Sequence, residues 1–158
     1  MAIGAATYLS EHLDAPVYVI SLGGIFVSDP GLLVVEHLYH LCGAEDRARH
    51  LGQIAPGRWP LFPASEWNRA LRQGRVSQIS MGSMGHTGKH GYLDKNSTTP
   101  NGIPFIDKTV QVIASIIDQN VNRLASGLQT QRNSDGPDLR RSSCSRPMTE
   151  FLHDDKIV

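Results

Sequence analysis

The spacing of apolar residues changes within the first part of the chain, from a helical period to a nearly continuous run. Helical spacing is seen in Ile3, Ala6, Leu9 and Leu13. Pro16 predicts the end of this helix, because proline interrupts helical hydrogen bonding. The following PVYVISL, residues 16–22, is rich in β-branched and aromatic residues, which is typical of a buried parallel strand. Gly23 and Gly24 predict where that strand ends.

Two later stretches predict further strands. A turn at SDPG, residues 28–31, in which Gly31 is able to adopt a positive φ, follows the first strand. VEHLYHL then alternates apolar and polar residues and precedes a loop-like GAED, so it predicts a strand over residues 35–41. VSQISMG, residues 76–82, alternates in the same way and predicts a third strand.

Helices are predicted on both sides of the third strand. SEWNRALRQG offers Ser65 as the N-cap and Gly74 as the stop of a short helix. Residues 47–64 carry charges and PGRWPLFP, which predict an irregular but ordered excursion. A glycine-rich loop over residues 82–102 leads into a long amphipathic helix. The expected apolar face of that helix consists of Val110, Ile113, Ile117 and Val121.

The alternation of helices and strands predicts the α/β class. Parallel strands joined by crossovers form such a sheet, and ligands bind beyond the carboxyl ends of its strands. We expect one partial α/β domain over residues 1–125 and a disordered tail over 126–158, because the tail has few apolar residues and no periodicity. The RRSSCS stretch in that tail is a short basic and serine-rich patch of a kind that arises often by chance.

Composition narrows the classes of function. The 15 basic and 15 acidic residues give a formal charge of zero, so the chain as a whole has no basic field for nucleic acid or an anionic membrane. No apolar run reaches the roughly 18 residues of a membrane span, and the start lacks the basic region of a secretory signal. The contexts of Cys42 and Cys144 differ too much to suggest a disulfide framework. These features predict a cytoplasmic protein, and no cofactor is indicated.

Two polar residues follow predicted strands. Asp46 lies in Gly43-Ala44-Glu45-Asp46 after the second strand, and His86 lies in the SMGHTG loop after the third strand and before the last helix. In this order and context the chain resembles the C-terminal half of an α/β-hydrolase of the lipase or esterase kind. The resemblance covers roughly residues 1–125 and implies a serine-hydrolase fold with Asp46 as triad acid and His86 as base. Glu45 and His90 remain alternative candidates.

The nucleophile that the resemblance requires is not evident in the chain. Ser21 in VISLGG resembles half of a G-x-S-x-G elbow, but Val19 replaces the first glycine and the short GGIFVSDPG leaves no room for the following helix. A better placement has the GAATYLSEHL helix following an elbow whose serine lies before Met1. We therefore expect a truncated hydrolase, inactive alone, that acts on a small-molecule ester or lipid-like substrate once a complementing N-terminal half or homo-association completes it.

Two other groups of residues, a possible zinc site and a possible partner-binding surface, carry weaker functional signals. His37, His40 and Cys42, together with His86 and His90, have zinc-binding side chains, but His37 and His40 would point to opposite faces of a strand. No metal site is therefore expected. The alternative function is a non-catalytic α/β module that binds a protein partner, with Trp59, Phe62 and Trp67 as its anchors.

Overall fold

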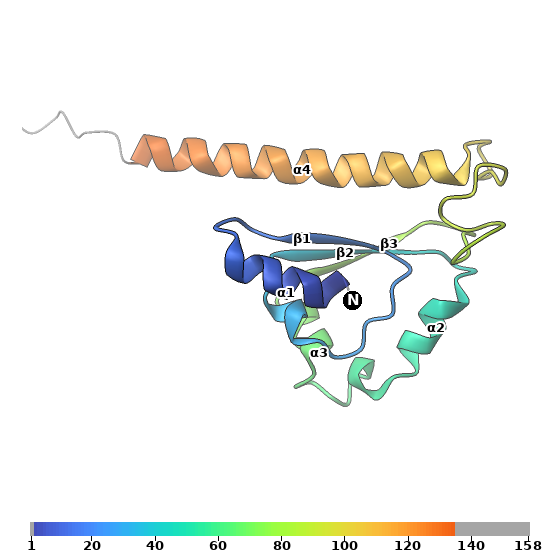
Figure 1. Cartoon of the computed structure of the whole chain (residues 1–158), viewed down its shortest axis with the longest axis horizontal. Coiled ribbons are helices and arrows are strands. Elements are labelled where there is room, and N and C mark those ends of the chain that lie inside the picture. The colour runs from blue at the N-terminus through green and yellow to red at the C-terminus, as the bar shows by residue number, and fades with distance from the viewer. Residues whose placement is uncertain (1, 135–158) are drawn as a thin grey trace, which may run out of the picture. The chain divides into compact units, whose positions relative to one another are not determined.

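The computed structural model describes residues 2–134. Contacts divide the chain into two units, residues 1–118 and 119–158, and each is described by itself. The elements follow one another as α1 (Ala2–His12), β1 (Tyr18–Leu22), the 3₁₀ helix η1 (Pro30–Leu33), β2 (His37–Cys42), α2 (Arg47–Gln53), the 3₁₀ helix η2 (Pro56–Arg58), α3 (Glu66–Arg72), β3 (Val76–Ser80) and α4 (Phe105–Ser134) (Figure 1). None of the helices within residues 2–134 is long and apolar enough to cross a membrane.

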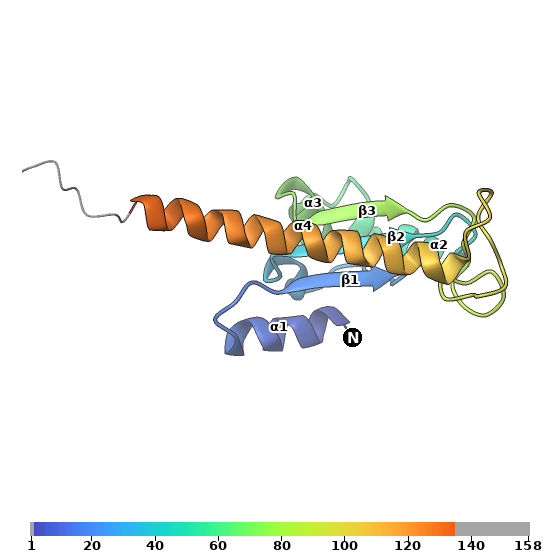
Figure 2. The same ribbon diagram turned by 90° about the horizontal axis from the view of Figure 1, so that it is seen from above.

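The sheet is small and entirely parallel. Its order is β1-β2-β3, with Ser21 opposite His40 and Leu41 opposite Ile79. Figure 2 shows the three arrows running side by side in the same direction. The predicted α/β class and its three strands are confirmed.

Each face of the sheet packs against helices. One face meets α1, η1 and α3 in a core formed by Ile3, Ala6, Val19, Leu32, Val35, Leu38, Trp67 and Ala70. The other face meets the beginning of α4 in a second core formed by Tyr39, Leu41, Met81, Met84, Tyr92, Phe105 and Ile116. The alternation along β1 and β2 assigns successive side chains to opposite cores, so the sheet is buried on both sides.

The helix before β1 buries only part of the predicted stripe. Ile3 and Ala6 are buried, whereas Leu9 and Leu13 are 44% and 51% exposed. Gly31 does not take the positive φ expected of it. A Cβ there would lie 2.5 Å from both Ile3 Cγ2 and Thr7 Oγ1, so glycine is required for the close approach of η1 to α1.

Helix α3 forms as predicted, with Ser65 Oγ accepting a hydrogen bond from Asn68 N at 3.3 Å and Gly74 at φ 69° after its end. The prediction for residues 47–64 was incomplete. Arg47–Gln53 form α2, whose Leu51 is 60% exposed, so no apolar stripe marked this helix in the sequence. The excursion beyond α2 is irregular apart from η2, as expected.

Helix α4 buries only part of the stripe that was predicted. Ile113 of the predicted face packs against the second core. Val110 and Ile117 are 57% and 51% exposed, while Phe105 and Ile116 are buried against the sheet. Val121, 57% exposed, was also expected on the buried face. The helix is regular through Ser134, so it includes residues 126–134, which were expected to belong to a disordered tail. The remainder of that expected tail, including RRSSCS and Cys144, lies outside the described residues.

Candidate functional site

Asp46 stands at the carboxyl end of β2, where α2 begins. Its side chain is fully buried. Ala48 N donates to Asp46 Oδ1 at 3.0 Å, so the carboxylate caps the first turn of α2. The Asp46 backbone N–H donates to Gly43 O at 3.4 Å, which closes the short turn after the strand. Residues close to Asp46 in the chain therefore hold its carboxylate and its backbone in place.

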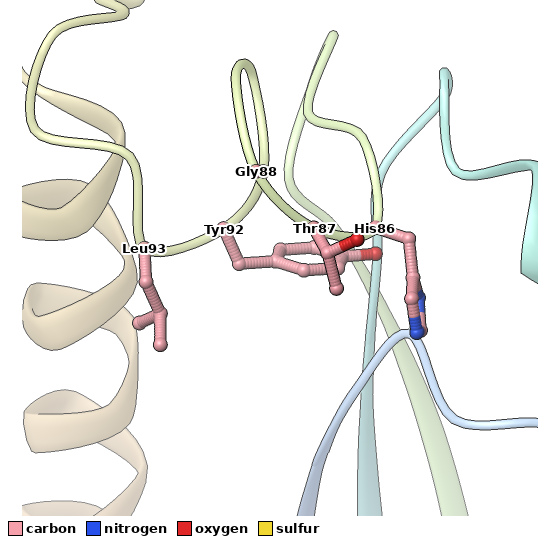
Figure 3. A pocket seen from close by; sticks show the side chains of 6 residues that line it. His86, Thr87, Gly88, Tyr92 and Leu93 are labelled. Carbon is pink, nitrogen blue, oxygen red and sulfur yellow. The ribbon is translucent and has the colours of Figure 1, made fainter.

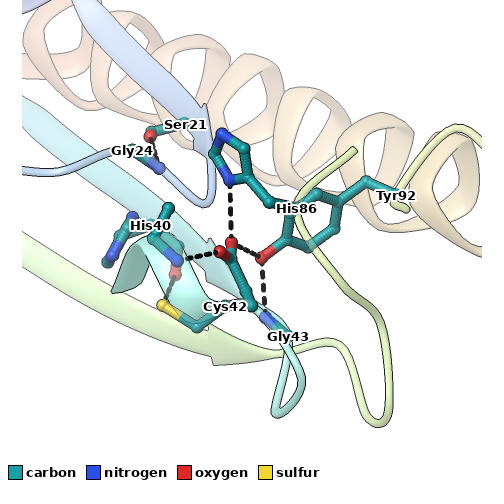
Figure 4. Close-up of polar contacts among 9 residues, drawn as sticks. Ser21, Gly24, His40, Cys42, Gly43, His86 and Tyr92 are labelled. Atoms are coloured by element: carbon teal, nitrogen blue, oxygen red, sulfur yellow. Dashed lines mark hydrogen bonds and ion pairs between the residues drawn. The ribbon is translucent and has the colours of Figure 1, made fainter. Parts of the chain in front are cut away.

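His86 lies in the loop after β3 and approaches Asp46 from the neighbouring strand. Its Nδ1 lies 3.1 Å from Asp46 Oδ2, and its side chain is 43% exposed whereas that of Asp46 is buried (Figure 4). A carboxylate oxygen only accepts, so Nδ1 carries the proton and Nε2 has its lone pair available as a base. The structure therefore brings together the two residues that the sequence named as acid and base.

Tyr92 completes the surroundings of Asp46 and was missed by sequence reasoning. Its hydroxyl donates to Asp46 Oδ2 at 2.8 Å and accepts from Gly43 N at 2.7 Å. Burial raises the pKa of the Tyr92 hydroxyl far above its usual value, and the Asp46 carboxylate raises it further. The hydroxyl is therefore a fixed donor to the same oxygen that faces His86. A tyrosine six residues after His86 was the only signal in the sequence.

Gly23, directly after β1, lies against this cluster. It has φ 60°, and a Cβ there would overlap Asp46 Oδ2 and lie 2.9 Å from both His86 Nδ1 and Tyr92 Cε2. Its N–H donates to Leu41 O at 2.9 Å, which continues the β1–β2 pairing. The carboxyl ends of all three strands thus contribute to one constellation, and only glycine fits at this position.

A pocket of about 270 Å³ opens beside His86. It is lined by His86, Thr87, Gly88, Gly91, Tyr92 and Leu93, all from the loop after β3 (Figure 3). The exposed imidazole reaches this space, so a small bound molecule there would meet the His86 side chain.

The alternative candidates lie elsewhere. Glu45 is exposed beside the buried Asp46. His90 has φ 67°, and its Nδ1 lies 3.0 Å from Ser97 Oγ, which in turn donates to Asp94 Oδ2 at 2.6 Å. His90 is therefore part of a hydrogen-bonded loop network, and His86 is the histidine bonded to Asp46.

Ser21 is not hydrogen-bonded to His86. It is buried on the face of β1 that also carries Val19, and its Oγ accepts from Gly24 N at 3.2 Å. Within residues 2–134 no hydrogen bond joins a serine, threonine or cysteine side chain to His86. The geometry agrees with the interpretation of Ser21 as a strand-end residue.

His37 and His40 lie on opposite faces of β2. His37 Nε2 lies 2.8 Å from Ser77 Oγ, whereas the buried His40 ring packs edge-on against Phe26 and Trp67 on the other face. Cys42 Sγ donates to His40 O at 3.5 Å. In the part of the chain that the structure describes, no three side chains of His, Cys, Asp and Glu gather as a group able to hold a metal ion.

The aromatic residues proposed as partner anchors divide into two kinds. Trp59 and Phe62 are 42% and 48% exposed. Trp67 is 3% exposed and packs in the core with Arg58 Cζ 3.7 Å from its ring centroid, so its selection as an anchor was wrong. Trp67 follows Glu66, the first residue of α3, and its side chain faces the sheet rather than solvent.

No protein-family model, curated protein or solved structure matches the chain. The resemblance to α/β-hydrolases consequently stays a prediction that depends on the residues and geometry described above.

Proposed function

We propose that this chain contributes the acid and base of an acyl-transfer site of the α/β-hydrolase kind, acting on a small carboxylic ester or lipid-like substrate. Asp46 orients His86 and stabilises its imidazolium, and His86 Nε2 takes the proton from an attacking hydroxyl. The observation that carries the proposal is the 3.1 Å contact between a buried carboxylate and a half-exposed imidazole at the carboxyl ends of parallel strands.

The nucleophile in this proposal comes from a segment other than residues 2–134, on this or another chain. Two features suit a nucleophile that approaches the N-terminal end of α1. Figure 2 shows α1 beside β1, with the N-terminal end of the helix toward the arrowhead of the strand, which is the end of the sheet where Asp46 and His86 lie. Helix N-termini also favour negative charge, which suits an oxyanion that develops near the beginning of α1.

Asp46 and His86 should catalyse a measurable reaction even without a nucleophile. The chain without its nucleophile is expected to be inactive toward its own substrate, but it should slowly accelerate hydrolysis of an activated ester such as p-nitrophenyl acetate, with His86 attacking the ester or activating water. His86→Ala should reduce the protein-dependent rate to the background of the other histidines, and Asp46→Asn should reduce it by about tenfold or more, because the imidazole loses its tautomer and its partner charge.

His90→Ala is the matched control, since His90 lies in the same exposed loop but bonds to Ser97. Equal rates for His86→Ala and His90→Ala would refute the proposed base. Labelling by a serine-directed fluorophosphonate gives a second test: covalent modification of Ser21 in the isolated chain would contradict a nucleophile supplied by another segment.

A further inference from the structure

The excursion between α2 and α3 exposes large apolar side chains that the acid–base site does not use. Their exposed fractions are 60% for Leu51, 68% for Ile54, 42% for Trp59, 82% for Leu61 and 48% for Phe62. These five residues are called the excursion surface below. Scattered single apolar residues are normal on proteins, but five within 12 residues of chain need a partner or an apolar medium.

The same part of the chain is strongly basic. Residues 47–75 contain six arginines and one glutamate, a net charge of +5, so the rest of the neutral chain carries −5. Arg47, Arg69 and Arg72 are exposed. The zero formal charge of the whole protein therefore conceals a positive segment, and this segment contains the excursion surface.

Hydrogen bonds join α3 and its Arg72 to the loop that carries Trp59 and Phe62. Asn68 Nδ2 of α3 donates to Trp59 O at 2.8 Å and to Phe62 O at 2.9 Å. Arg72 donates to Pro63 O at 2.6 Å. Trp59 and Phe62 have ring centroids 6.3 Å apart. Helix α3 thus presents its arginines beside a loop whose aromatic rings are exposed.

We propose that the excursion surface adsorbs to an anionic lipid bilayer, with the apolar side chains inserted at the interface and the arginines against the headgroups. Exposed aliphatic and tryptophan side chains surrounded by arginines are what an interfacial anchor requires, because apolar burial and attraction to acidic lipids act together. The net charge of +5 over residues 47–75 favours an acidic surface over a neutral one. The proposal goes beyond the acid–base pair and does not depend on it.

Adsorption also has a consequence for the neighbouring site. Helix α2 begins one residue after Asp46, and Ala48 N bonds to the Asp46 side chain, so the excursion surface and the acid–base pair are joined by a single helix. A bilayer bound at the excursion surface would lie adjacent to the element that holds Asp46.

Cosedimentation of the full chain with vesicles tests the proposal without any reaction. Binding should be strong to phosphatidylserine–phosphatidylcholine vesicles and weak to phosphatidylcholine alone, and should fall with added salt. Leu51→Ser with Ile54→Ser should lower the partition coefficient by at least about tenfold, since two inserted side chains are lost. Arg47→Gln and Arg69→Gln should each lower it by roughly fivefold.

The matched control is Leu9→Ser with Leu13→Ser, which removes two leucines of similar exposure, one in helix α1 and one just beyond it. That variant should bind vesicles like the unmodified chain. Trp59 fluorescence should shift to the blue on binding, whereas the buried Trp67 should not respond, so Trp59→Phe should abolish the shift.

Three results would overturn the proposal. The first is equal vesicle binding by the variant at 51 and 54 and its α1 control. The second is binding to neutral vesicles that matches binding to acidic ones. The third is an absence of vesicle binding accompanied by self-association that is lost in the same variant, which would assign the excursion surface to a second copy of the chain. Loss of ester hydrolysis in His86→Ala with vesicle binding intact would separate this surface from the acid–base site.

Discussion

Gly23→Ala is the most direct test of the constellation around Asp46. Only a single carbon is added, but it would overlap Asp46 Oδ2 and lie 2.9 Å from His86 Nδ1. The backbone at this position has φ 60°, a left-handed conformation that alanine adopts at a cost. Relief of the overlap requires the carboxylate to move, and the contact with His86 would be lost with it.

The magnitude follows from two contributions to the free energy of unfolding. The left-handed conformation costs roughly 1–2 kcal/mol for alanine, and forcing a methyl group into a packed site costs about 1–3 kcal/mol. Gly23→Ala should therefore destabilise the chain by about 2–5 kcal/mol, or by roughly 10–20 °C in Tm for a domain of this size. Gly74→Ala provides the control, because Gly74 has φ 69° and no atom within 4 Å of its Cβ position.

Urea unfolding followed by Trp67 fluorescence gives the two free energies, and their difference isolates the overlap with Asp46. NMR of the His86 ring proton, which is hydrogen-bonded to the carboxylate, reports the acid–base contact itself. The ring-proton signal should be lost in Gly23→Ala and kept in Gly74→Ala. If both variants lose the same stability and both keep the signal, then Gly23 does not contact Asp46 and the described geometry is wrong.

Three further predictions concern single side chains. Tyr92→Phe should lower the free energy of unfolding by about 1–3 kcal/mol, because the buried Gly43 N–H loses its acceptor. Since burial raises the pKa of Tyr92, the stability that this residue contributes below about pH 10 is lost as pH rises. Urea midpoints of the variant should lack this alkaline decrease. Trp67→Ala should cost about 3–5 kcal/mol in the same assay, and the exposed Trp59→Ala within about 0.5. The Ser97 hydroxyl holds the pKa of Asp94 below its usual range, so stability is lost as pH falls below about 4, and Asp94→Asn should flatten that acid slope.

The strands and the proximity of Asp46 and His86 were predictable from the sequence because each depends on a local signal. Residues 16–22 form an apolar run between turn residues, and Asp46 and His86 lie in the loops that follow β2 and β3. Parallel strands then bring their carboxyl ends together, so two residues 40 positions apart become neighbours without any local sign of contact.

What could not be predicted depends on contacts that a local pattern does not contain. On α4, Val110 and Ile117 define one apolar stripe and Phe105 and Ile116 another, and periodicity cannot choose between two stripes on one helix. Packing against the second core determines that Phe105 and Ile116 are the buried residues. Helix α2 was missed for the opposite reason, since its Leu51 faces solvent and its first turn is held by a carboxylate rather than by an apolar face.

The proposed acid–base pair and the proposed excursion surface are connected through Asp46, whose two carboxylate oxygens accept hydrogen bonds from different elements. Oδ2 receives His86 and Tyr92 from the loop after β3, whereas Oδ1 receives the first turn of α2. Ionised carboxylates only accept, so each donor added around Asp46 restricts its rotation further. An acid held in this way orients His86 without rearrangement, and the helix that helps to hold it leads directly into the excursion surface. The residues proposed to bind lipid and the residues proposed to orient the base are therefore adjacent along the chain, and single substitutions can test them separately.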